Sequence, residues 1–162
     1  NHLKRCLLLH RRKEFSMSAI SVQQEKRDAA PPVYILKVHN SPYTLDPYRD
    51  RLESQGFKVV DADTYDAGLN LAGRYRPSLV LVNDDPDTGI NALRWLEMQH
   101  TSRYGWLATT PLIILADETR LPFLRPEQLP DRVVVLQRRA DTLNRLAQTA
   151  RYLMHVWGLA RP

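Results

Sequence analysis

The sequence predicts an α/β fold in which helices cover both faces of a mostly parallel sheet. From Pro32 onward, short apolar runs alternate with longer segments of helical periodicity, which is the pattern of successive β-α units. The apolar runs are rich in Val, Ile and Leu, as expected for strands that are buried on both faces. A chain of 162 residues is long enough for one domain with a substantial core.

The elements can be placed in order along this part of the chain. We expect strands at residues 33–38, 57–62, 79–82, 112–115 and 133–136, each a short apolar run. We expect helices at residues 46–55, 66–75, 90–100 and 141–159. The last helix is the clearest, because its apolar residues recur every three or four positions along one stripe, namely Leu143, Leu146, Ala147, Ala150, Leu153, Met154 and Trp157.

A fourth helix would be expected at residues 117–131, but prolines interrupt this segment. They occur at four-residue intervals, as Pro122, Pro126 and Pro130. Each proline inside a helix removes a backbone donor and clashes with the preceding turn, at a cost of about 3 kcal/mol. We therefore expect an ordered loop or a single turn, held by apolar side chains that include Leu121, Phe123 and Leu124.

The basic charge of the chain is concentrated in its first residues. Residues 1–30 hold seven basic and three acidic side chains, whereas the remainder holds 16 basic and 15 acidic ones. Residues 1–31 are interpreted as a disordered basic arm or a remnant of expression, with a targeting or surface-binding helix at residues 3–13 as the weaker alternative. The folded part is too close to neutral for us to expect nucleic-acid binding.

Several functional classes find no support in the sequence. No apolar run approaches the roughly 20 residues of a membrane span. The single cysteine, Cys6, can form neither an internal disulfide nor a zinc site, so we expect a reducing, cytoplasmic location. Since there is no glycine-rich phosphate loop, P-loop or nucleophile motif, we expect no enzymatic activity.

Several segments resemble a response-regulator receiver domain of the chemotaxis-regulator type. They are His39-Asn40-Ser41-Pro42, the stretch Leu52-Glu53-Ser54-Gln55-Gly56-Phe57-Lys58-Val59-Val60, Arg76-Pro77-Ser78-Leu79-Val80-Leu81-Val82-Asn83, Thr110-Pro111-Leu112-Ile113-Ile114-Leu115-Ala116 and Val135-Leu136-Gln137-Arg138-Arg139. Their joint spacing matches that family from residue 32 to residue 159, and the receiver-like domain is assigned to residues 32–160. The resemblance implies a flavodoxin-like, doubly wound, five-stranded parallel sheet of order 2-1-3-4-5.

The resemblance also implies that the phosphorylation pocket of such domains is degenerate here. The acidic pair that would hold Mg²⁺ corresponds to His39 and Asn40, and the phosphoacceptor aspartate corresponds to Asn83. The hydroxyl residue corresponds to Ala116 and the lysine to Arg138, while the aromatic switch residue corresponds to Val135. An imidazole and an amide are poor Mg²⁺ ligands, and an amide is no carboxylate nucleophile, so we expect neither a bound metal ion nor phosphorylation.

Two alternatives use the same region differently. A one-residue slip would place Asp84 in the acceptor position, with Asp85 as its neighbour, so a carboxylate in this loop could accept phosphate. Alternatively, the vacated pocket could bind a small molecule or an anion through Arg138, His39 and Asn83. We interpret His39 itself as a hydrogen-bonded filler, because no second metal ligand or nucleophile accompanies it in the sequence.

The leading hypothesis is a phosphorylation-independent pseudo-receiver that acts in two-component-type signal transduction by binding a protein. The partner would be a signalling protein or an output domain of the same protein, and a homodimer is a further option. No cofactor and no membrane contact are expected. The family's contact face corresponds here to the proline-containing segment, the fifth strand and the last helix, where the candidate contact residues are Arg120, Phe123, Arg125, Val135, Tyr152 and His155.

Overall fold

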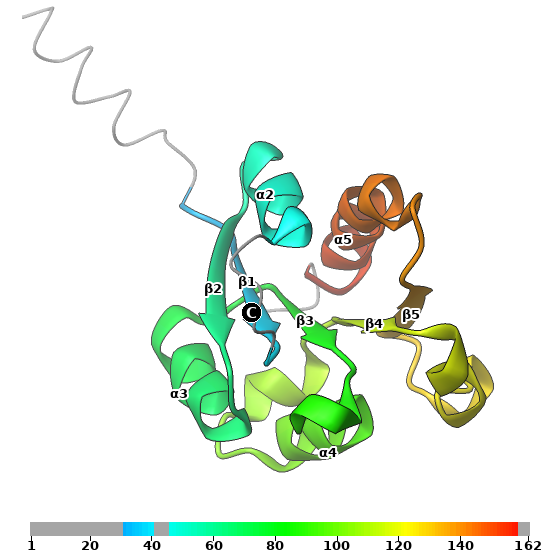
Figure 1. Ribbon diagram of the computed structural model, residues 1–162. Helices are drawn as coiled ribbons and strands as arrows, with labels where there is room; N and C mark the ends of the chain where they lie inside the picture. The colour runs from blue at the N-terminus through cyan, green and yellow to red at the C-terminus, as the bar shows by residue number, and fades with distance from the viewer. Residues whose placement is uncertain (1–30, 41–45, 159–162) are drawn as a thin grey trace, which may run out of the picture. The chain divides into compact units, whose positions relative to one another are not determined.

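The computed structural model describes residues 31–40 and 46–158, and these form a five-stranded parallel sheet covered by helices (Figure 1). The strands are β1 (Tyr34–Val38), β2 (Lys58–Ala62), β3 (Leu79–Asn83), β4 (Leu112–Ala116) and β5 (Val133–Gln137). They are ordered β2-β1-β3-β4-β5, so the predicted topology is confirmed. Each strand lies within one or two residues of its predicted position.

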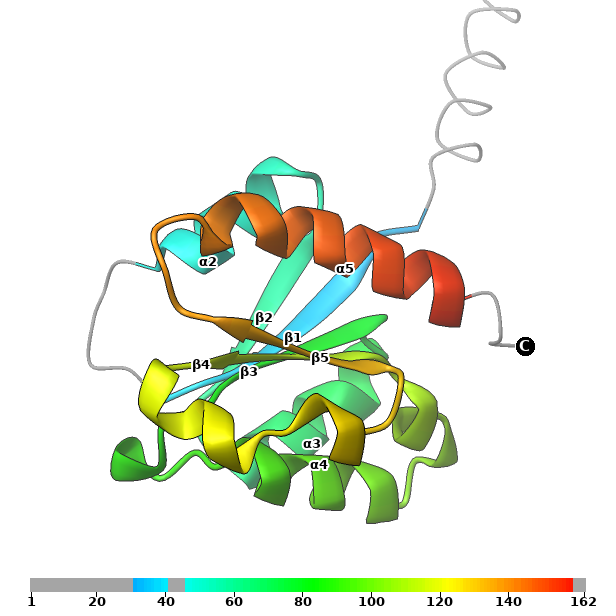
Figure 2. The ribbon, with the colours of Figure 1, turned by 90° about the vertical axis from the view of Figure 1, so that its right-hand side faces the viewer.

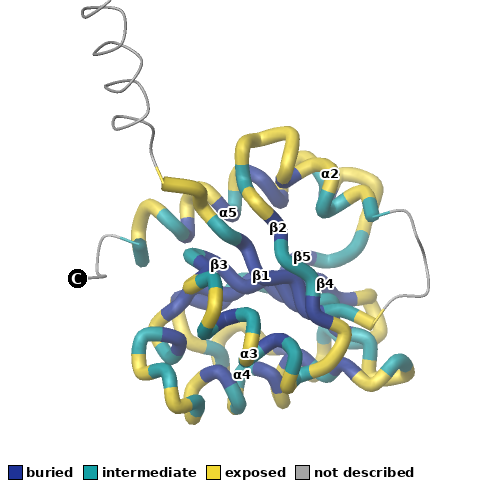
Figure 3. Tube along the Cα trace, turned by 90° about the vertical axis from the view of Figure 1, so that its left-hand side faces the viewer, coloured by how far each residue is buried: buried dark blue, intermediate teal, exposed yellow. Residues whose placement is uncertain are grey.

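Helices cover the sheet in two layers (Figure 2). One face carries α2 (Pro47–Ser54) and α5 (Thr142–Gly158), and the other carries α3 (Tyr65–Tyr75) and α4 (Ala92–Thr101). Alternate strand residues therefore enter two cores: Ile35 and Leu81 pack with Leu146 and Leu153 of α5, whereas Val82 packs on the opposite face. Figure 3 shows that the central strands β1, β3 and β4 are almost continuously buried between these layers, as predicted from their composition, whereas the edge strands β2 and β5 are only partly buried.

Side-chain caps fix where three of the helices begin. Asp46 accepts hydrogen bonds from the backbone amides of the first turn of α2, and Pro47 occupies the first helical position, where no amide donor is needed. Thr64 caps α3 and Asn91 caps α4 in the same way. These caps use polar residues at the junctions between strands and helices, so the local sequence sets both the start and the direction of each helix.

The layer of α3 and α4 depends on a close approach at Gly68. A Cβ atom at Gly68 would lie 2.8 Å from Cζ3 of Trp95, which is fully buried, and 3.4 Å from Val38. Glycine at this position lets α3 settle against the indole of α4. The indole nitrogen in turn donates to Gln99, which is also buried, at 2.9 Å. The packing therefore leaves no room for a larger residue at position 68 of α3.

The segment between β4 and β5 contains no α-helix, as its prolines predict. It forms two short 3₁₀ helices, η3 (Glu118–Phe123) and η4 (Pro126–Gln128). Leu124 is the main apolar anchor and is buried, while Leu121 is partly buried. Phe123, which was also expected to help hold the segment, is instead 63% exposed.

Residues 1–30 of the predicted basic arm lie outside the described residues, and the interpretation of the arm remains a prediction. Within residues 31–40 and 46–158, no helix combines the length and the hydrophobicity that a membrane crossing would require.

Candidate functional site

Four positions of the predicted pocket stand at the carboxyl ends of neighbouring strands. Asn83 and Ala116 are the last residues of β3 and β4, while His39 and Arg138 come directly after β1 and β5. Since these four strands are adjacent and parallel, their carboxyl ends meet at one edge of the sheet. Open α/β sheets bind ligands at that edge. The structure thus brings the four residues to the place that the resemblance implies.

Arg138 cross-links this edge. Its guanidinium hydrogen-bonds to the side-chain oxygen of Asn83, donates from Nη2 to the backbone oxygen of Asp84 at 3.0 Å, and donates from Nε to Asp117 at 2.8 Å. Its backbone amide donates to the backbone oxygen of Ala116 at 2.9 Å. One side chain therefore joins the ends of β3, β4 and β5, and all three guanidinium nitrogens already have partners within the protein. The charged hydrogen bond from Arg138 lowers the pKa of Asp117.

Asp84 is a structural anchor between β3 and α4. Its side chain is fully buried, and its Oδ1 accepts from the backbone amide of Ala92 at 2.8 Å. Its Oδ2 accepts from Nε of Arg120 at 2.7 Å. Both carboxylate oxygens are thus engaged, which leaves neither exposed for attack on a phosphoryl donor. Asp85, the neighbouring candidate, is half-buried and forms an isolated backbone bridge with Ile90.

The positions that correspond to the acidic pair have separate partners. Nε2 of His39 lies 2.9 Å from Oδ1 of Asp61 in β2, while its buried Nδ1 has no hydrogen-bond partner. Asn40 is exposed and donates from its side chain to the backbone oxygen of Thr88 at 2.8 Å. His39 was predicted to be a hydrogen-bonded filler, and this applies to its Nε2 but not to its Nδ1.

The surroundings of His39 lower its pKa and so favour the neutral imidazole. Burial and, to a lesser extent, the positive charge of Lys37 lower the pKa of His39 below its ordinary value of 6.5, although Asp46 and Asp63 act in the opposite direction. Lys37 itself is 4% exposed, and burial lowers its pKa despite the opposing effect of Asp46. A neutral imidazole next to a buried ammonium group is consistent with the mutual repulsion of two cations.

A network of ion pairs beneath His39 was missed in the sequence. Lys37 pairs with Asp46, and Arg49 pairs with Asp61. Burial alone would raise the pKa of Asp46, but the hydrogen bonds from Lys37 and the backbone amide of Arg49 lower it overall. A signal was present: Lys37 is a charged residue inside an otherwise apolar strand, and such a residue needs a buried counter-ion.

Three side chains of this network, His39, Asp46 and Asp61, have ligand atoms within 4.8 Å of one another, close enough to share a metal ion. The sequence prediction of no metal site did not consider this triad. Its two carboxylates are, however, already neutralised by Lys37 and Arg49. A divalent cation would have to displace both and would then face two positive charges, so the donor set is a poor fit for Mg²⁺.

The predicted contact face is divided between both sides of β5. Tyr152 and His155 are exposed on α5, whereas Phe123 and Arg125 are exposed on and next to η3, against the opposite face of the sheet (Figure 2). The remaining two residues play a different part. Arg120 pairs with Asp84 and its guanidinium lies 5.1 Å above the ring of Phe123, while Val135 is partly buried against the core and offers little surface.

Comparisons with known proteins identify the fold. No family model matches the chain, and no curated protein matches its sequence. Among solved structures, the response-regulator receiver domain protein from Clostridium thermocellum superposes with a TM-score of 0.62 at 17% identity, covering 80% of this chain and 99% of that one. The signal receiver domain of a signal transduction histidine kinase from Syntrophus aciditrophicus gives 0.60 at 17% identity, with 76% and 91% covered. The N-terminal domain of a response regulator/sensory box/GGDEF 3-domain protein from Carboxydothermus hydrogenoformans gives 0.56 at 18% identity, with 78% and 98% covered. The chain therefore has the fold of the receiver domains of two-component signalling.

Proposed function

We propose that this chain is a non-enzymatic pseudo-receiver that binds a protein partner in two-component-type signal transduction without being phosphorylated. The observation that supports this most directly is the bonding of Arg138. Its guanidinium binds Asn83, at the position of the phosphoacceptor, together with Asp84 and Asp117. A phosphoryl group at this edge would have to displace these bonds, and an amide at position 83 could not form the acyl phosphate.

The state of Asp84 supports the same proposal. A receiver phosphorylated on Asp84 would need one carboxylate oxygen free, but Ala92 and Arg120 engage both oxygens of a side chain with no exposed surface. Charged hydrogen bonds in a buried site are worth about 1.5–3 kcal/mol each. Phosphorylation would therefore first have to detach α4 and η3 from the end of β3.

Phosphorylation independence can be tested by incubating the full chain with acetyl phosphate and Mg²⁺ and measuring its intact mass. We expect no hydroxylamine-labile phosphoryl adduct, whereas a receiver with a complete acidic pocket, run in parallel, should gain one. An adduct on the wild-type chain would contradict the proposal. The variants Asp84→Asn and Asp85→Asn would then show whether either neighbouring carboxylate had accepted the phosphoryl group.

Protein binding is proposed for the surface on both sides of β5, because two large aromatic side chains are mostly exposed there. Phe123 is 63% exposed and Tyr152 is 64% exposed. Aromatic side chains are enriched where proteins bind one another. The partner is expected to be a cytoplasmic signalling protein or an output domain joined to this one, since the similar structures include a receiver of a histidine kinase and the first domain of a three-domain protein.

Site-specific photo-cross-linking in cells tests this surface. A photoreactive residue placed at position 152 or 123 should cross-link to one common protein that carries a histidine-kinase or output domain. The same residue at Leu93, which is 38% exposed on α4, serves as a matched control and should not capture that protein. A cross-link to a second copy of the chain would identify a homodimer instead. Capture that is equal at all three positions would refute the proposed surface.

A further inference from the structure

A second surface lies towards the amino ends of the strands, away from the carboxyl ends that carry the predicted pocket. Here arginine side chains lie over aromatic rings. We call it the arginine–aromatic patch and define it as Arg74, Tyr75, Arg76, Arg103, Tyr104 and Trp106. It is formed by the end of α3 and by the segment that includes the start of η2 (Gly105–Thr109). Guanidinium carbons lie 5.3 Å from the ring centre of Tyr75, 5.1 Å from that of Trp106 and 4.9 Å from that of Tyr104.

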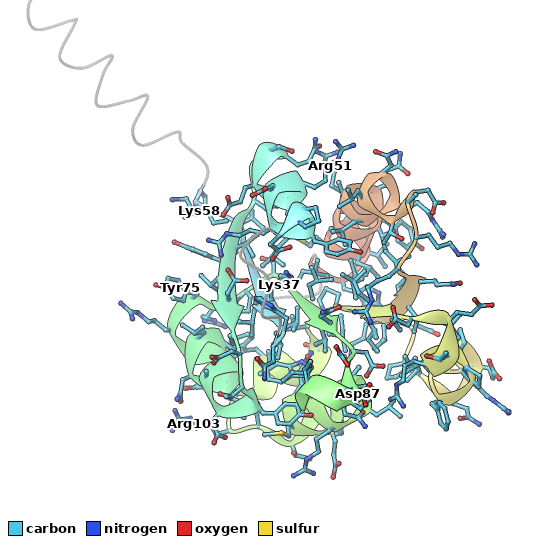
Figure 4. All side chains as sticks on the ribbon, in the orientation of Figure 1. Lys37, Arg51, Lys58, Tyr75, Asp87 and Arg103 are labelled. Carbon is cyan, nitrogen blue, oxygen red and sulfur yellow. The ribbon has the colours of Figure 1, made fainter. Side chains whose placement is uncertain are left out.

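The guanidinium of Arg76 over the ring of Trp106 joins the two segments of the patch. The rings of Tyr104 and Trp106 are 5.8 Å apart, and Tyr75 lies 5.0 Å from the ring of Tyr34. Tyr34 and Tyr75 line a shallow groove of about 510 Å³ together with Lys58, which adds a further cation. Figure 4 shows Lys58, Tyr75 and Arg103 along one side of the domain. A partner could therefore contact all of these groups at once.

The cations of the patch differ from those at the carboxyl edge in having no counter-ions. At the carboxyl edge Arg49, Arg120 and Arg138 all pair with carboxylates. By contrast, across residues 31–40 and 46–158 no ion pair involves the three arginines of the patch or Lys58. Glu53 borders the groove but pairs with Arg49. The patch thus concentrates positive charge in a domain whose total charge is close to zero.

Two backbone features hold the patch in place. The hydroxyl of Tyr104 packs directly against Gly73, in space that any Cβ atom would occupy, and it accepts a hydrogen bond from Arg103 at 2.8 Å. Arg76 ends α3 in the left-handed conformation, with φ of 46°. Glycine is the usual residue at such a position, because a side chain there costs about 1–2 kcal/mol. This backbone conformation accompanies the placement of the Arg76 guanidinium over the ring of Trp106.

From this arrangement we infer that the arginine–aromatic patch is a docking site for an acidic segment of a partner protein. Arginine, tyrosine and tryptophan are the residues that dominate binding energy at protein interfaces, and cations without counter-ions complement carboxylates. A nucleic acid fits less well, because residues 31–162 carry 16 basic and 15 acidic side chains and so provide little of the long-range attraction that phosphate binding needs. This surface is additional to the one proposed around β5.

The inference can be tested by titrating the full, ¹⁵N-labelled chain with a peptide of repeating Glu-Glu-Tyr triplets and recording amide and indole shifts by NMR. We expect shifts at residues 73–76 and 103–106, including the Trp106 indole. Arg76→Gly and Arg103→Gln should each weaken binding about five- to tenfold, as loss of an interface hot spot does. Arg94→Gln is the matched control, since Arg94 is exposed on α4 and paired with Glu97, and it should change binding less than about twofold.

Thermal unfolding separates loss of binding from loss of folding. Arg76→Gly should melt no earlier than the wild-type chain, because glycine relieves the left-handed strain. Three results would overturn the inference: shifts confined to residues 1–30, equal binding by all variants, or tighter binding of an oligothymidylate through the same residues. The acetyl phosphate and cross-linking experiments do not depend on these results, so the proposed function is tested independently of the patch.

Discussion

The pairing of Asp84 with Arg120 should dominate the stability of the carboxyl edge. Arg120→Ala would leave a fully buried carboxylate without its cation, whereas Asp84→Ala would leave a guanidinium that is 22% exposed and can reach water. Breaking a buried pair costs about 3–5 kcal/mol, and the partial exposure of Arg120 places this pair at the lower end. We expect a loss of about 3 kcal/mol for Arg120→Ala. Asp84→Ala should cost about the same, because it also leaves the amide of Ala92 without an acceptor.

The two substitutions should not be additive. Once one partner is gone, removal of the other relieves an unpaired charge, so the double variant should lose about 1.5–3 kcal/mol less than the sum of the single variants. Urea unfolding followed by tryptophan fluorescence measures all four proteins. Arg125→Ala is the control, because Arg125 is exposed on the same segment without an ion pair among the described residues, and it should change stability by less than about 0.5 kcal/mol. A coupling energy below about 0.5 kcal/mol, or a nearly neutral Asp84→Ala, would refute the assignment of Asp84 as an anchor.

Three further outcomes follow from other parts of the domain. Asp46→Asn retains a side-chain oxygen to cap α2 but leaves the buried Lys37 without a counter-ion, so it should cost about 2–4 kcal/mol, and Asp46→Ala about 1 kcal/mol more, as measured by urea unfolding. Because the pKa of His39 is lowered in the fold, the unfolded chain takes up a proton more readily below about pH 6.5, and stability should fall as the pH decreases through that window. His39→Asn should remove this part of the pH dependence, and unfolding midpoints at pH 7.5 and 5.5 that shift equally in both proteins would contradict it. Gly68→Ala gains about 1 kcal/mol of helix propensity but forces a Cβ atom against the buried ring of Trp95, so its melting temperature should fall rather than rise.

Most of the fold could be predicted because its cause is local. The apolar strands, the stripe on α5 and the prolines at 122, 126 and 130 each act within a few residues, and they determine the strands, the helix and the interrupted segment. The order of the strands came from the resemblance to receivers, because no local rule states which strands become neighbours. The positions of strands and helices along the chain were therefore easier to predict than the contacts between them.

The bonding within the site could not be predicted in the same way. The resemblance assigned Arg138 and Asn83 to one pocket, but the bonds of Arg138 to Asp84 and Asp117 depend on how three strand ends meet. The role of Asp84 as an anchor was not predicted, because its partner Arg120 is 36 residues away in a segment without regular periodicity. The charged side chain of Lys37 inside the apolar strand β1 indicates a buried counter-ion, yet nothing in the sequence identified that counter-ion as Asp46.

The bonds of Arg138 have a consequence for how such a domain would transmit information. A phosphorylated receiver stores a signal for as long as its acyl phosphate survives, so the signal has a lifetime that a phosphatase can shorten. Here the group bonded at the position of the phosphoacceptor is the guanidinium of Arg138, which is a permanent part of the chain. If the domain binds its partner as proposed, the extent of binding depends only on the concentrations of the two proteins and their Kd. Its output would then be adjusted by synthesis and degradation, on the timescale of gene expression.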